Sequence, residues 1–243
     1  NLNNYYDVNL KLKRLKLIKK QIKFYKIDIT NFKKLKDIFK KYNPDIVINL
    51  AAQAGVRYSI KQPKKYISVN IKGFFNVIEL SRKFKVKHFL FASSSSVYGK
   101  NTKIPFNEND NTSSQTNIYG VTKKTNEIMA HSFSHLYNLK CTALRFFTVY
   151  GPWGRPDMAL FKFTQNILNE EEIKIFNFGN MFRDFTYIDD AVNYTFNLIK
   201  KKKNKSYNNN LFEIFNIANS KPVNIMKFIK IIEFYLKKKA KIK

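Results

Sequence analysis

Short apolar runs alternate along the chain with longer amphipathic stretches. Continuous apolar runs are typical of strands covered on both faces, and apolar positions three or four residues apart are typical of helices. The predicted strands cover residues 22–27, 45–50, 86–92, 142–146, 173–176 and 213–217. The predicted helices cover residues 8–20, 31–41, 64–84, 118–137, 158–169, 189–200 and 224–238, and a lysine- and asparagine-rich loop is expected at 200–210. This alternation predicts an α/β fold with a doubly wound parallel sheet.

The charge of the chain raises the question of a nucleic-acid partner, because the formal net charge is +28. Of the 45 basic residues, 39 are lysine and 6 are arginine, and neither a zinc-finger spacing nor an aromatic RNA-binding motif is present. Direct reading of bases depends heavily on arginine. We therefore expect no specific nucleic-acid partner and attribute the charge to overall composition, with a functional basic surface as the alternative.

The cysteine content and the length of the apolar runs indicate where in the cell the protein resides. A single cysteine, Cys141, excludes an internal disulfide, and no apolar run approaches the roughly 20 residues that a membrane-spanning helix needs. We expect a cytoplasmic protein with no membrane partner.

The sequence offers no clear metal site. His88, His131 and His135 form no ligand pattern with acids or cysteine, and we interpret them as structural or surface residues. Asp189 and Asp190 stand at the start of a predicted helix, where an N-cap and a helix-dipole partner explain them better than a metal ion does.

One helix carries the first chemical signal. Tyr119 and Lys123 are four residues apart, so a helix places the phenol and the ammonium group on one face. A nearby cation favours the phenolate and lowers the phenol pKa, which allows the tyrosine to remove a proton from a hydroxyl group near neutral pH. This pattern is common by chance, but here a run of four serines, 93–96, ends a buried strand upstream. Open parallel sheets place ligands at such strand ends.

Several longer motifs accompany this pair. They are NLAAQAGVR at 49–57, SSSSVYG at 93–99, YGVTK at 119–123, LRFFTVYGPWGRPDM at 144–158 and RDFTYIDD at 183–190. With them the chain resembles, over essentially its whole length, the NAD-dependent nucleotide-sugar epimerase/dehydratase family of extended short-chain dehydrogenases, and most closely the UDP-glucuronate 4-epimerases. The resemblance implies a Rossmann-like NAD-binding domain over 1–150, which includes the Tyr119 helix. It implies a partial substrate-binding lobe over 151–243, with some elements returning to the core domain.

The resemblance also implies a reaction. Bound NAD would take a hydride from C4 of a nucleotide sugar and return it to the other face of a 4-keto intermediate. Positions 95 and 96 are both serine, whereas the dehydratases and decarboxylating enzymes of the family carry an acidic residue there. We therefore expect 4-epimerisation, of UDP-glucuronate to UDP-galacturonate in particular. UDP-glucose/UDP-galactose or another nucleotide sugar is the alternative substrate.

Individual roles follow from the same resemblance. The implied catalytic residues are Tyr119, Lys123, Ser94 and Ser96. The implied cofactor-binding residues are Asp28, Ile29, Ala51, Ala52, Gln53, Asn70, Ser93, Tyr119, Lys123 and Phe146. The implied substrate-binding residues are Ser94, Ser95, Ser96, Thr148, Arg155 and Arg183.

For two of the arginines, a structural role is the alternative to the implied substrate-binding role. Arg183, expected at the substrate diphosphate, can instead pair on the surface with Asp184 or Asp189. Arg155, expected with Thr148 at a hexuronate carboxylate, can instead stabilise its own loop.

The glycine-rich turn that cradles a dinucleotide pyrophosphate is not among these 243 residues. Both ends look cut, so we expect a fragment that is inactive by itself, and an inactive or non-catalytic binding protein is the alternative of a different class. Family members commonly form homodimers through a helical bundle that includes the Tyr119 helix, and we expect the same here. Polysaccharide biosynthesis is the process that the family implies.

Overall fold

The computed structural model describes residues 1–200 and 211–243, and it divides them into two compact units. The first unit consists of Asn1, residues 26–147 and the described part of 193–217. The second consists of residues 2–25, 148–192 and 218–243. The loop predicted at 200–210 lies outside the described residues except for Lys200, where a helix ends. The domain roles assigned from the sequence stay predictions.

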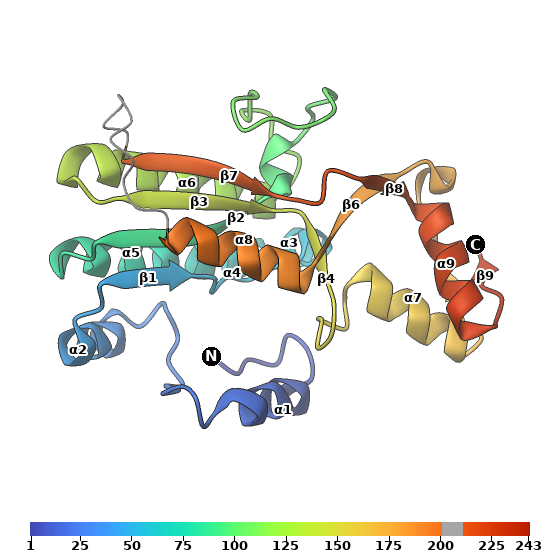
Figure 1. The fold of residues 1–243 in the computed structure, drawn as a ribbon, viewed down its shortest axis with the longest axis horizontal. Coiled ribbons are helices and arrows are strands. Elements are labelled where there is room, and N and C mark those ends of the chain that lie inside the picture. The colour runs from blue at the N-terminus through green and yellow to red at the C-terminus, as the bar shows by residue number, and fades with distance from the viewer. Residues whose placement is uncertain (201–210) are drawn as a thin grey trace. The chain divides into compact units, whose positions relative to one another are not determined.

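A parallel sheet forms the centre of the first unit (Figure 1). Its strands are β1 (Ile46–Asn49), β2 (His88–Ser94), β3 (Cys141–Phe146) and β7 (Phe212–Ile217), in the order β1-β2-β3-β7. All three pairings are parallel, and Phe91 of β2 lies opposite Asn49 on one side and Ala143 on the other. β2 and β3 are almost entirely buried, and apolar residues on both faces, as in Phe89, Leu90 and Phe91 of β2, replace the alternation of a half-exposed strand. The predicted parallel α/β fold is confirmed.

Helices surround this sheet. They are α2 (Phe32–Tyr42), α3 (Val56–Lys61), α4 (Pro63–Tyr66), the π-helical segment η1 (Ile67–Gly73), α5 (Phe74–Lys83), the 3₁₀ turn η2 (Ser95–Tyr98) and α6 (Ile118–Tyr137). In Figure 1, α5 and α6 lie behind the sheet, and residues 193–200 of α8 (Ile188–Lys200) lie in front of it. α6 packs on β2, β3 and β7, so it crosses the centre of the sheet.

The helix predicted over 64–84 is interrupted. Its middle widens into η1 before α5 continues to Lys83. Such π-helical turns often mark functional sites. Here the turn brings Gly73 so close to Ile29 that a Cβ on the glycine would lie 2.7 Å from Ile29 Cγ1.

Aromatic packing between α5 and the sheet forms the core of the first unit. The Phe74 ring contacts the rings of Phe89 and Phe91 edge-on, at 5.7 and 5.1 Å between centroids. All three side chains are buried. Each contributes about 1.5–3 kcal/mol through burial. This packing fixes β2 and thereby the position of the serine run at its end.

The second unit combines short strands with helices. Its strands are β4 (Thr148–Tyr150), β5 (Glu172–Ile173), β6 (Phe182–Tyr187), β8 (Pro222–Asn224) and β9 (Lys241–Ile242), and its helical elements are α1 (Val8–Ile18), α7 (Ala159–Leu168), the turn η3 (Asn177–Gly179), the start of α8, and α9 (Ile225–Leu236). β6 pairs with β4 in parallel and with β8 in antiparallel orientation. The stacked rings of Phe185 and Phe228, 4.3 Å apart, join β6 to α9 in the core of this unit.

Some predicted elements were wrong. The strand expected at 22–27 does not form, and Ile22 and Phe24 are exposed, because no described strand pairs with this segment. The strand expected at 173–176 is reduced to the two residues of β5. The strands β4, β6 and β8 were not predicted, since their sequences mix polar and apolar residues over three to six positions.

A buried histidine couples this fold to pH. His88 begins β2, and its Nε2 lies 2.8 Å from Thr142 Oγ1 on β3. Burial, with a smaller contribution from the nearby Lys140, lowers the pKa of His88 from 6.5 to about 4. Between these two pH values the unfolded chain binds a proton that the folded chain excludes. Stability is therefore lost as the pH falls from 6.5 towards 4.

We predict that His88→Gln removes this component of acid destabilisation, because glutamine does not gain a charge. The measurement is the free energy of unfolding in urea at pH 7, 6, 5 and 4. The difference between wild type and variant should shift in favour of the variant as the pH falls. The exposed His131→Gln is the matched control and should follow the wild type, and identical pH profiles for wild type and His88→Gln would contradict the prediction.

Candidate active site

The serine run forms a tight turn at the carboxyl end of β2. Ser94 ends the strand, and its hydroxyl accepts a hydrogen bond from the backbone N–H of Ser96 at 3.2 Å, which caps η2. Gly99 closes the turn with a φ of +56°, and a Cβ at this position would overlap the carbonyl oxygen of Ser114. Ser95 and Ser96 are half-buried. The turn therefore presents hydroxyl groups at the sheet edge where parallel folds bind ligands.

Helix α6 begins directly against this turn. The side chain of Asn117 caps it by accepting from the N–H of Gly120 at 2.8 Å. Gly120 packs so closely that a Cβ there would lie 2.8 Å from the carbonyl oxygen of Ser96. The half-buried Tyr119 is thereby placed next to the serine turn, and its ring meets Tyr66 edge-on at 6.2 Å between centroids.

Lys123 lies one turn further along α6 and is only 4% exposed. Its Nζ donates to the carbonyl oxygen of Ala92 at 2.6 Å and lies 5.9 Å from the centre of the Tyr119 ring. Burial lowers the pKa of Lys123 from 10.5 to about 8. The structure thus brings Tyr119, Lys123 and the serine turn together, as their spacing in the sequence predicts.

A buried amide ties the segment after β1 to the same helix. Asn70 of η1 accepts from the N–H of Gln53 at 2.7 Å and donates to the Gln53 carbonyl at 3.0 Å. It also donates to Thr122 Oγ1 at 3.0 Å. Ala51 is exposed and Ala52 is half-buried, so the backbone of this segment is accessible beside a rigid anchor.

The other residues expected at the cofactor are more dispersed in the first unit. Asp28 accepts hydrogen bonds from Asn1 and from the N–H and hydroxyl of Thr30. Burial raises the pKa of Asp28, but these hydrogen bonds outweigh it and leave the pKa lowered. The Ile29 carbonyl accepts from Asn76 of α5 at 3.0 Å, and Phe146 ends β3 opposite Ser94. Their cofactor roles stay predictions.

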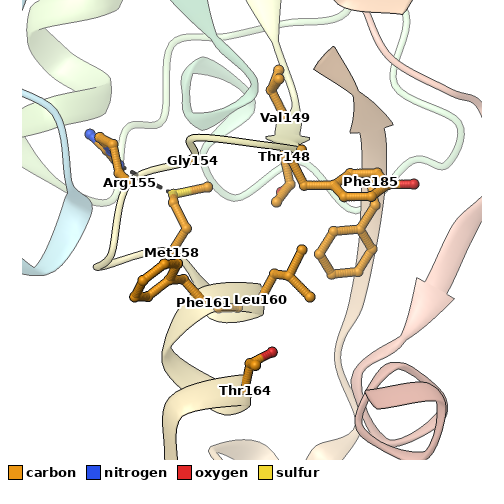
Figure 2. A pocket seen from close by; sticks show the side chains of 12 residues that line it. Thr148, Val149, Gly154, Arg155, Met158, Leu160, Phe161, Thr164 and Phe185 are labelled. Carbon is orange, nitrogen blue, oxygen red and sulfur yellow. Dashed lines mark hydrogen bonds between the residues drawn. The ribbon is translucent and has the colours of Figure 1, made fainter. Parts of the chain in front are cut away.

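In the second unit, Thr148 and Arg155 line a mostly apolar cavity of about 140 Å³ with Met158, Phe161 and Phe185 (Figure 2). Figure 2 shows Arg155 at the rim, with its guanidinium on the side away from Phe185. The guanidinium pairs with Asp157, at 3.2 Å from Nε to Oδ1, and contacts Met158 Sδ at 3.2 Å. These contacts fit a loop-stabilising role, and the role at a sugar carboxylate stays a prediction.

Arg183 is exposed on β6 and donates to the carbonyl oxygen of Phe182 at 2.8 Å. It forms no ion pair with Asp184 or Asp189 among the described residues, so the surface-pairing alternative has no support in this conformation. Asp189 and Asp190 occupy the first turn of α8, which begins one residue earlier.

The described residues contain neither a cluster of metal-ligating side chains nor a membrane-spanning helix. No group of three or more potential metal-ligating side chains occurs in residues 1–200 and 211–243. Within the same ranges, no helix has the length and apolar character needed to cross a membrane.

The sequence did not predict the buried ion pair beneath this site. Glu127 of α6 and Arg145 of β3 meet at 2.9 Å and are 2% and 1% exposed. Ser93, expected at the cofactor, turns its hydroxyl inward and donates to Glu127 at 2.6 Å. Arg145 is one of six arginines and lies inside the 144–158 motif, but nothing in the sequence identifies its partner.

Comparison with known proteins decides the family. The sequence model of the NAD dependent epimerase/dehydratase family matches residues 3–218. The chain belongs to this family. NAD is its cofactor, and the predicted family, fold class and cofactor are confirmed.

Relatives place the chain among the nucleotide-sugar 4-epimerases of the family. It is 50% identical to protein CapI of Staphylococcus aureus over 252 residues, which cover 99% of this chain and 75% of CapI. It is 44% identical to a UDP-glucuronate 4-epimerase of Thermodesulfobacterium geofontis over 99% of this chain and 73% of that protein. A solved UDP-glucuronic acid 4-epimerase from Bacillus cereus, in complex with UDP-glucuronic acid and NAD, aligns with a TM-score of 0.86 at 30% identity, over 97% of this chain and 73% of that chain.

The residues of the first unit fit a bound NAD on the ribose side. The Lys123 ammonium has three N–H donors, and Ala92 accepts from one of them at 2.6 Å, so two donors suit ribose hydroxyls. The buried Oδ1 of Asn126, on the next turn of α6, has no hydrogen-bond partner in the described structure and offers a further acceptor.

We predict that Lys123→Met abolishes a stability change at alkaline pH. The folded chain releases the Lys123 proton near pH 8 and the unfolded chain near 10.5, so burying this lysine costs less as the pH rises between them. Unfolding in urea from pH 7.5 to 10.5 should show wild type gaining stability relative to the variant. Lys124→Met, on the more exposed neighbour, is the control, and a constant difference between wild type and Lys123→Met would contradict the prediction.

Proposed function

We propose that this protein catalyses the 4-epimerisation of UDP-glucuronate to UDP-galacturonate. The observation that carries the reaction type is the packing of Tyr119 and Lys123 against a serine turn that contains no carboxylate. The choice of sugar is supported by relatives named UDP-glucuronate 4-epimerase, at 41 to 44% identity. One of these is UDP-glucuronate 4-epimerase 4 of Arabidopsis thaliana, of which the chain covers 58%.

The chemistry needs a base that can take a proton and return it. Bound NAD supplies reversible hydride acceptance at C4 of the sugar. Tyr119 removes the proton of the C4 hydroxyl as the C4–H bond breaks, and it returns the proton when the ketone is reduced. Lys123 stabilises the phenolate as a neighbouring cation. Ser94 and Ser96 orient the C4 hydroxyl by hydrogen bonding.

The absence of an acid in the serine turn limits the reaction. Elimination of water from the sugar requires a group that protonates the leaving hydroxyl. Ser95 and Ser96 occupy the positions where the dehydratases of the family carry an acidic residue, and a serine hydroxyl is too weak an acid for that task. A 4-keto sugar formed here is therefore reduced again rather than dehydrated.

Thr148 and Arg155 are our candidates for binding the hexuronate carboxylate. A hydroxyl and a guanidinium at one cavity are suitable partners for a carboxylate, and the planar guanidinium can bind it with two N–H groups. Arg155 pairs with Asp157 in this conformation, so substrate binding would replace that contact. We also propose that Arg183 contacts the diphosphate from its exposed position on β6.

We further propose a homodimer in the cytoplasm, formed through α5 and α6. Phe75, Val121 and Ile128 on these two helices expose 44, 38 and 58% of their surface and can contribute apolar area to a subunit interface.

The first prediction from this function concerns turnover. The full-length protein, incubated with UDP-glucuronate, should form UDP-galacturonate, detected by NMR from the configuration at C4. Tyr119→Phe should lower kcat by about 10²–10⁴-fold, because it removes the general base. Tyr66→Phe is the matched control, since it alters a neighbouring phenol.

Comparing UDP-glucuronate with UDP-glucose as substrates tests the choice of sugar. Arg155→Leu should raise the KM for UDP-glucuronate, because it removes the partner of the carboxylate. The KM for UDP-glucose, which has no carboxylate, should not change. Turnover of UDP-glucose but not UDP-glucuronate by the wild type would replace the proposed substrate, and turnover of no nucleotide sugar would favour a binding role.

A second prediction concerns the 243-residue chain by itself. It contains no G-x-x-G-x-x-G turn, whose backbone N–H groups hold a dinucleotide pyrophosphate. We expect it to bind NAD much more weakly than the full-length protein and to show no epimerase activity. Titration calorimetry with NAD on both forms is the measurement, and equal affinities would contradict the expectation.

A further inference from the structure

The ion pair between Glu127 and Arg145 uses both oxygens of the carboxylate. Arg145 donates from Nε to Oε1 at 2.9 Å and from NH2 to Oε2 at 3.0 Å. Ser93 adds a hydrogen bond to Oε1 at 2.6 Å, and Lys124 approaches Oε2 from the more exposed side at 3.4 Å. The carboxylate is thus held in one orientation by two neighbouring strands and its own helix.

Glu127 lies four residues after Lys123 on α6, and side chains at this spacing are neighbours on a helix surface. The Lys123 ammonium is buried and donates to a neutral backbone carbonyl, that of Ala92. A carboxylate is a far stronger partner for a buried ammonium than a carbonyl. Without a competitor, Glu127 would therefore attract Lys123 away from Ala92 and Tyr119.

Arg145 is itself fixed from its other side. Its NH1 donates to the Tyr98 hydroxyl at 3.0 Å and to the Glu108 carbonyl at 3.1 Å. The Tyr98 hydroxyl donates in turn to Asn216 Oδ1 of β7 at 2.7 Å. Arg145 therefore cannot swing away from Glu127 without breaking bonds to η2 and to the segment before α6.

We propose that Arg145 is a positioning residue that keeps the catalytic lysine in place. By occupying both oxygens of Glu127, it prevents a pair between Glu127 and Lys123 and leaves the Lys123 ammonium at Ala92, facing Tyr119. Arg145 acts through Glu127 and touches neither substrate nor cofactor. This inference rests on the proposed roles of Tyr119 and Lys123.

The test compares a single with a double variant of the full-length holoenzyme. Arg145→Met releases the carboxylate, and we expect kcat to fall about ten- to a hundredfold, the range of coupling between contacting residues, with KM little changed. Arg145→Met combined with Glu127→Gln removes the competing charge and should recover most of the lost kcat. If Arg145 served only the packing of the core, the double variant, which loses one more native bond, would be no more active than the single variant.

A spectroscopic measurement separates this inference from the proposed reaction. The ionisation of the Tyr119 phenol can be followed by ultraviolet absorbance, as the difference between each protein and its Tyr119→Phe counterpart, without any sugar. Arg145→Met should raise the pKa of this phenol, because Lys123 moves away, and the double variant should return it towards the wild-type value. The other ionisable groups here, Tyr66 facing Tyr119, Lys124 at Glu127 and Tyr98 at Arg145, are identical in all variants.

Folding is monitored by circular dichroism and thermal unfolding of every variant. If Arg145→Met does not fold, Arg145→Lys replaces it, because a lysine binds one carboxylate oxygen and leaves the other accessible. It should show a smaller loss of kcat with the same direction of change in the phenol pKa. Where the wild type turns over, a wild-type kcat and phenol pKa in the Arg145 variant, or a double variant no better than the single variant in either measurement, would overturn the proposal. Loss of turnover in all proteins with the expected phenol shifts would refute the proposed reaction and leave the positioning role intact.

Discussion

The burial of charge on α6 is the constraint on which the site depends. This helix crosses the centre of a parallel sheet and carries an ammonium group and a carboxylate into its interior. Burying a charge is costly unless it is paired or hydrogen-bonded. The carboxylate of Glu127 pairs with Arg145, whereas the ammonium of Lys123 donates to the backbone carbonyl of Ala92. Because Glu127 pairs with Arg145 and not with Lys123, the Lys123 ammonium remains available for chemistry. The Glu127–Arg145 pair meanwhile anchors α6 to the sheet.

The backbone around this helix is rigid for reasons of space. Gly120 allows the first turn of α6 to approach Ser96 of the serine turn, and Gly99 allows the end of the serine turn to approach the backbone of Ser114, more closely than a side chain would permit. Asn70 fixes the segment after β1 to Thr122 on the same helix. Tyr119 therefore stands between two anchored backbone segments, so its phenol needs little reorganisation before it can act on a hydroxyl group.

The sequence was most informative where local pattern and chemistry agree. The strands β1 and β2 were recognisable from the apolar runs within 45–50 and 86–92, and Tyr119, Lys123 and the serines were recognisable by spacing. The segment 22–27, in which two lysines interrupt the apolar residues, forms no strand, because strand formation requires a partner that local sequence does not specify. The ion pair of Glu127 with Arg145 joins two residues that are 18 positions apart and lie on different elements, α6 and β3. Only the register of the sheet and the rotation of α6 determine that these two side chains meet.

The buried lysine also links ligand binding to the proton balance of the solution. Its pKa of about 8 reflects the loss of water around the ammonium group. A ligand whose hydroxyl oxygens accept from that group restores part of the lost solvation and raises the pKa. Above pH 8, where much of the lysine is neutral, such a ligand binds together with a proton drawn from the buffer. The affinity for such a ligand and the uptake of a proton are then coupled through Lys123. Ligand binding therefore depends on pH before any reaction begins.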